Sequence, residues 1–69
     1  MTPEQQEIEK RKKAITKELR LLFKANMKIS DWDIPEADDQ KVATLLLTVM
    51  QEALDGIKEE IAEGRYKTY

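Results

Sequence analysis

The sequence contains no cysteine and no histidine. Without cysteine the chain forms no disulfide and performs no thiolate chemistry. Without histidine it has neither imidazole catalysis nor the commonest protein ligand of metal ions. Glycine and proline occur only twice each, so long loops are not expected. These absences exclude several classes of enzyme and leave hydrophobic packing as the main source of stability.

Long apolar runs are also missing. No stretch approaches the ~18 apolar residues that indicate a membrane-spanning helix. The opening residues, Met1 followed by Thr-Pro-Glu-Gln-Gln, lack the charged and apolar regions of a signal peptide. We therefore expect a cytoplasmic protein that does not interact with a membrane.

The chain, at 69 residues, is short for a domain that folds alone. A domain of this size buries only about 60% of the surface that its unfolded form exposes. Small scaffolds usually compensate with disulfides, a bound metal or self-association. Because cysteine and histidine are absent, the sequence favours self-association.

The charges are strongly segregated, although the net charge is only −2. Residues 10–28 contain eight Lys or Arg and one acid, for a net +7, whereas residues 29–63 contain ten acids and two Lys, for a net −8. A chain with a pI near 5.1 is a poor general binder of nucleic acid. One face of it can still be basic, because the cations are concentrated in a single segment.

A first helix is predicted from about residue 3 to about residue 26. Thr2, Pro3 and Gln5 have the types and the spacing of a helix start with a capping box. No glycine or proline then interrupts the chain before Pro35. Apolar residues recur at helical spacing along this segment: Ile8, Ile15, Leu19, Leu22 and Phe23.

Residues 27–38 are predicted to form the connection. Asn26 can end a helix in a left-handed conformation, and Ile34 is biased away from helical geometry because Pro35 follows it. The largest apolar side chains of this segment are expected to cover the closed end of the fold: Ile29, Trp32 and Ile34.

A second helix is predicted from about residue 38 to residue 63. Asp38 or Asp39 is a suitable N-terminal cap, and Gly64 is a strong signal for the end of a helix. The remaining basic and aromatic tail, residues 64–69, is expected to be frayed.

Two long helices with one connection predict an all-α fold, in which the whole chain, residues 1–69, forms a single antiparallel helical hairpin. Stacking the two helices along their lengths places Lys12 near Glu60. We expect these two side chains to form an ion pair near the open end.

The second helix is more apolar than one neighbouring helix can cover. At about 100° per residue, its apolar side chains occupy an arc of roughly 200°, wider than the ~100° stripe of an ordinary surface helix. We therefore predict a homodimer that forms a four-helix bundle. Alternatively, the connection or a different protein covers the part of this apolar arc that the first helix leaves exposed. The predicted interface residues are Leu45, Leu46, Leu47, Val49, Met50, Ala53, Leu54 and Gly56.

The first helix carries a line of cations opposite its apolar stripe, which we call the basic ridge: Lys10, Lys13, Lys17, Arg20 and Lys24. Such a ridge can bind an acidic protein or a phosphate backbone, or it can be simply a solvated face. Trp32 is the other candidate partner-binding residue, because Trp is common at the centres of interfaces. Its alternative role is the cap over the closed end.

The acidic residues do not form a recognisable site. Read from Asp31, a calcium-binding loop of the EF-hand type would need Gly at 36 and Glu at 42, but the chain has Glu36 and Val42. The remaining roles for the acids of the connection are helix capping, contact with a basic partner or a loose site for a divalent cation. The acids of the second helix lack the His that di-iron bundles require. We expect no catalytic residues, no metal site and no cofactor.

These observations favour a small non-enzymatic adaptor, regulator or inhibitor that binds another protein and associates with itself. A nucleic-acid-binding hairpin dimer that uses the basic ridge is the alternative, and a structural assembly subunit is a third hypothesis. The predicted outline is similar in shape to small RNA-binding or regulatory helical dimers, but it shares no motif with them.

Overall fold

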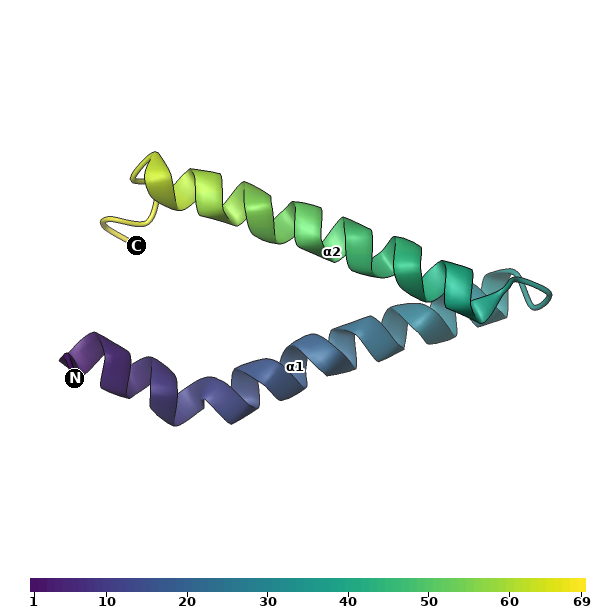
Figure 1. Cartoon of the computed structure of the whole chain (residues 1–69), viewed down its shortest axis with the longest axis horizontal. Coiled ribbons are helices and arrows are strands. Elements are labelled where there is room, and N and C mark those ends of the chain that lie inside the picture. Colours follow the sequence, from purple (N-terminus) through teal and green to yellow (C-terminus); the bar gives the residue numbers. More distant parts are fainter.

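The computed structural model describes all 69 residues and contains two α-helices and no strand. Helix α1 runs from Pro3 to Asp33 and helix α2 from Asp39 to Ala62. The helices are antiparallel and form a V, with the connector at the closed end and both termini at the open end (Figure 1). The prediction of an all-α chain with two helices packed against each other is confirmed.

The start of α1 is held by the capping box that the sequence predicts. The backbone N–H of Gln5 donates to Thr2 Oγ1 at 3.1 Å, and the backbone N–H of Thr2 donates to Gln5 Oε1 at 2.9 Å. Pro3 occupies the first turn, where its missing N–H leaves no hydrogen bond unmade.

The end of α1 was predicted wrongly, because the helix continues seven residues beyond Asn26. The side-chain amide of Asn26 donates to the carbonyl oxygen of Leu22 at 2.9 Å, so it bonds within the helix instead of ending it. The last helical residue is Asp33, and Ile34 follows it with φ of −134° and ψ of 80°, outside the helical region that Pro35 disfavours for the residue before it. The connector is therefore residues 34–38, shorter than predicted.

Local signals at both ends of α2 were predicted correctly. Asp38 accepts from the backbone N–H groups of Gln40 at 3.0 Å and Lys41 at 3.4 Å. At the other end Gly64 has φ of +81°. Its N–H donates to the Ile61 carbonyl, and the N–H of the next residue donates to the carbonyl of Glu60, which together form a Schellman motif.

The two helices approach each other most closely near the closed end (Figure 1). The half-buried apolar side chains of this part of the hairpin are those of Phe23, Met27, Ala37, Val42, Ala43, Leu46 and Met50, and no residue of the chain is fully buried. Towards the termini the helices diverge (Figure 1).

The expected ion pair between Lys12 and Glu60 does not form. Lys12 Nζ lies 4.0 Å from Glu9 of its own helix, and Glu60 accepts a hydrogen bond from Tyr66. The expectation assumed that the helices stay adjacent along their lengths, whereas they are apart at the open end (Figure 1).

Candidate functional site

A groove of about 610 Å³ lies between the two helices on one side of the hairpin. Its apolar walls come from Leu19 and Phe23 of α1 and from Ala43, Leu47, Met50 and Leu54 of α2. Its polar margins differ in charge. The α1 margin has Thr16, Arg20 and Lys24, whereas the α2 margin has Gln40, Thr44 and Gln51.

A second apolar surface, which we call the back face, does not line this groove. On α1 it consists of Ile8, Ile15, Leu22 and Ile29, which recur every seven residues and therefore lie along one side of the helix. On α2 it includes Leu45 and Val49. These six side chains are each 41–61% exposed.

Helical geometry places the back face and the groove on opposite sides of the hairpin. Leu22 lies about 100° around α1 from the groove residue Phe23, and Leu45 lies about 160° around α2 from the groove residue Leu47. The back face of α1 is also about half a turn from the basic ridge. The hairpin therefore presents two separate apolar surfaces, of which only the groove borders the cations.

The residues of the predicted interface on α2 are thus divided among several environments. Leu46 is half-buried in the contact between the helices, Leu45 and Val49 lie on the back face, and Ala53 is exposed. Gly56 is half-buried, and an added Cβ would meet no atom within 4 Å. The remaining three residues line the groove: Leu47, Met50 and Leu54.

The basic ridge is exposed along α1, and none of its cations forms an ion pair within the chain. The ion pairs of the chain join Arg11 to Glu7, Lys12 to Glu9 and Arg65 to Glu63. A hollow of about 670 Å³ beside α1 is lined by ridge residues together with Glu9, Lys12, Thr16 and Leu21. Arg20 and Lys24 belong to both the ridge and the groove margin, so the two features are continuous.

Trp32 does not cover the closed end, so that expectation was wrong. Its side chain is 86% exposed. Because α1 continues through this residue, Trp32 lies about 140° around the helix from Met27, which faces α2. The indole is therefore accessible to a partner.

Negative charge is concentrated at the closed end. The side chains of Asp31, in the last turn of α1, and Asp39, at the start of α2, meet there. The pKa of Asp39 is raised above its usual 3.8, first by a hydrogen bond with Asp31 and then by repulsion from it. The last turn of α1 has no cation to offset its acids. No group of three or more acids is arranged to hold a metal ion.

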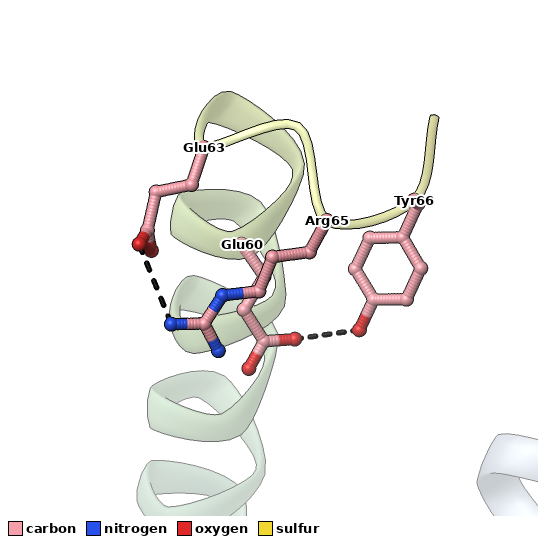
Figure 2. A network of polar contacts seen from close by, with 4 residues as sticks. All are labelled: Glu60, Glu63, Arg65 and Tyr66. Atoms are coloured by element: carbon pink, nitrogen blue, oxygen red, sulfur yellow. Dashed lines mark hydrogen bonds and ion pairs between the residues drawn. The ribbon is translucent and has the colours of Figure 1, made fainter. Parts of the chain in front are cut away.

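The C-terminal tail folds back over the last turns of α2, which differs from the frayed segment that was expected. Tyr66 Oη donates to Glu60 Oε1 at 2.5 Å, and an Arg65 guanidinium nitrogen lies 3.4 Å from Glu63 Oε2 (Figure 2). The rings of Tyr66 and Tyr69 are 5.7 Å apart. The hydrogen bond to Glu60 is the main reason that the pKa of Tyr66 is raised above 10.0.

No protein-family model, curated protein or solved structure compared with this chain matches it. Neither helix is both long and apolar enough to cross a membrane.

Proposed function

We propose that the protein is a small non-enzymatic adaptor, regulator or inhibitor that binds another protein and associates with a second copy of itself. The observation that carries this proposal is the exposure of the apolar side chains on both sides of the hairpin. Leu45 and Leu47, two residues apart on α2, are 58% and 51% exposed on opposite sides.

The drive to cover these side chains is large. Full burial of one Leu or Ile contributes about 1.5–3 kcal/mol, whereas the net stability of a whole domain is about 5–15 kcal/mol. Several such side chains left in water also make the kind of apolar patch that marks an interaction site. A second copy is always present, and it completes a four-helix bundle.

The back face is the better surface for self-association, because pairing two grooves brings like charges together in both symmetric arrangements. If α1 faces the second α1, the two basic ridges meet, including Arg20 and Lys24. If α1 faces the second α2, the two acidic connectors lie at the same end of the bundle. If the two copies instead pair through their back faces, with each α1 antiparallel to the α1 of the other copy, the basic ridges lie on the outer sides of the dimer. The two acidic connectors then lie at opposite ends.

Light scattering at micromolar concentration tests the proposal. The mass should be at least twice the chain mass of 8.1 kDa. A monomer at every accessible concentration would contradict self-association.

Nucleic-acid binding is the second candidate function, because the cations of the basic ridge are unpaired within the chain. Five phosphate contacts would make the logarithm of the binding constant fall with the logarithm of salt concentration with a slope of roughly −4. We favour protein binding, since the chain as a whole is acidic, with a pI near 5.1, and such a chain is a poor general binder of nucleic acid.

Titration of labelled duplex and single-stranded oligonucleotides at two salt concentrations separates these functions. The wild-type protein is compared with the triple variant Lys13→Glu, Lys17→Glu, Arg20→Glu, whose changes lie on an exposed face. Negligible binding at physiological salt supports the protein-binding function. Tight, salt-sensitive binding that the triple variant loses would replace it with the nucleic-acid function.

A further inference from the structure

We infer that the groove between α1 and α2 receives an amphipathic helix of another protein, and that this helix carries acidic side chains on the flank that lies over α1. The inference rests on the proposed protein-binding function and specifies the chemistry of the partner.

The walls of the groove have the length and the spacing of a helix-binding surface. On α2 the apolar wall residues Ala43, Leu47, Met50 and Leu54 follow one another at intervals of four, three and four. Eleven residues of helix separate the first from the last, which corresponds to a length of about 16 Å. A partner helix of about three turns, with apolar side chains at the same spacing, covers this wall by the helix-in-groove mode.

The margins of the groove set the charge of the partner helix. Arg20 and Lys24 stand on the α1 margin, and Lys13 and Lys17 extend the same positive surface along α1. None of these four cations is paired within the chain. The α2 margin has no charged residue among those that line the groove. The complementary helix is therefore acidic on one flank and uncharged on the other, which also fixes its orientation around its own axis.

A second copy of the chain is a poorer occupant of the groove. Both symmetric groove-to-groove arrangements place like charges together, whereas the back face offers a second copy an apolar surface remote from the ridge. The groove then stays open on the outside of the dimer.

A displayed library of helical peptides about three turns long provides the test. Leu is fixed at positions i, i+4 and i+7, and each flank is varied among Glu, Gln and Lys. Selection on the wild-type protein should enrich Glu on one flank and Gln on the other. Selection on the double variant Arg20→Glu, Lys24→Glu should enrich Lys on that same flank. The matched control is Lys10→Glu, Lys28→Glu, which changes the charge equally away from the groove and should still select Glu.

Leu47→Lys locates the binding surface. Selected peptides should bind this variant at least about tenfold more weakly, while its mass by light scattering stays that of the wild-type oligomer. The inference would be overturned if the Arg20→Glu, Lys24→Glu variant selected the same flank residues as the wild type, or if no peptide were enriched at all. Loss of the oligomer in Leu47→Lys would show that a second copy fills the groove. An oligomer that selects no peptide refutes the inference alone, whereas a monomer that selects none refutes the proposed function as well.

Discussion

The dimer that we propose should be dissociated by Leu45→Lys and left intact by Leu47→Lys. The two substitutions are closely matched, because both replace a roughly half-exposed Leu of α2 with the same residue. Lys has a helix propensity close to that of Leu, so α2 itself should be preserved. The variants differ in the side of the hairpin that they change: Leu45 lies on the back face and Leu47 lines the groove.

The size of the effect follows from the exposed part of the side chain. Leu45 is 58% exposed in the single chain. Since full burial of a Leu contributes about 1.5–3 kcal/mol, covering the exposed part contributes about 1–1.7 kcal/mol per copy and about 2–3.5 kcal/mol in a symmetric dimer. Losing this contribution weakens dimerisation by roughly 30- to 300-fold, before any penalty for placing a charge in the interface.

Sedimentation equilibrium over a range of concentrations measures the dissociation constant, and far-UV circular dichroism checks that the helices persist. Wild type and Leu47→Lys should give similar constants, and Leu45→Lys a much larger one. The reverse order, with Leu47→Lys dissociated and Leu45→Lys dimeric, would refute the assignment of the back face to self-association.

Three further predictions concern orientation and stability. In an antiparallel back-face dimer, Ile15 lies opposite Leu22 of the second copy, so a mixture of Ile15→Cys and Leu22→Cys chains should form a disulfide-linked pair under oxidation, whereas neither variant should link to itself. Gly64→Ala should lower the unfolding free energy by about 1 kcal/mol, because Gly64 has φ of +81°, and Gly64→Asn should lower it less; thermal unfolding checks both. Asp31 raises the pKa of Asp39, so the folded state is penalised as the pH rises through that raised pKa, and the penalty is absent below the usual 3.8. Asp31→Asn should therefore raise the melting temperature at neutral pH more than the matched Asp33→Asn, and this difference should be absent below pH 3.8; a difference that persists there would contradict the interaction.

The sequence predicts the ends of the helices best where a single short motif decides them. Thr2 with Gln5, Asp38 and Gly64 each act through hydrogen bonds to backbone groups a few residues away, so the information is local. Asn26 shows the limit of such reasoning. The same side chain is compatible with a left-handed helix end or with a hydrogen bond to the carbonyl four residues earlier, and in an uninterrupted helix the second arrangement is found.

The positions that depend on the arrangement of the two helices were predicted less well. Helical spacing identified the basic ridge and the wide apolar surface of α2, but it did not show that the helices diverge towards the open end. The expected cover by Trp32 required a connector that begins before residue 32, whereas α1 continues through it. The expected contact of Lys12 with Glu60 required two helices that stay adjacent along their lengths. The groove was missed for the same reason, although one signal was present, since Arg20 and Lys24 directly follow Leu19 and Phe23 along α1.

The arrangement of surfaces around α1 connects self-association with partner binding. Its back-face residues and its basic ridge lie about half a turn apart, so a dimer that buries the first must display the second on its outer sides. Each outer side of the proposed dimer would then carry one groove with one cationic margin, which would make this dimer bivalent. Two acidic helices of one target, or of two joined targets, would be bound with an effective concentration that a monomer cannot provide. Self-association would thus set the avidity of an adaptor, and a partner that separated the back faces would reduce partner binding without contacting the groove.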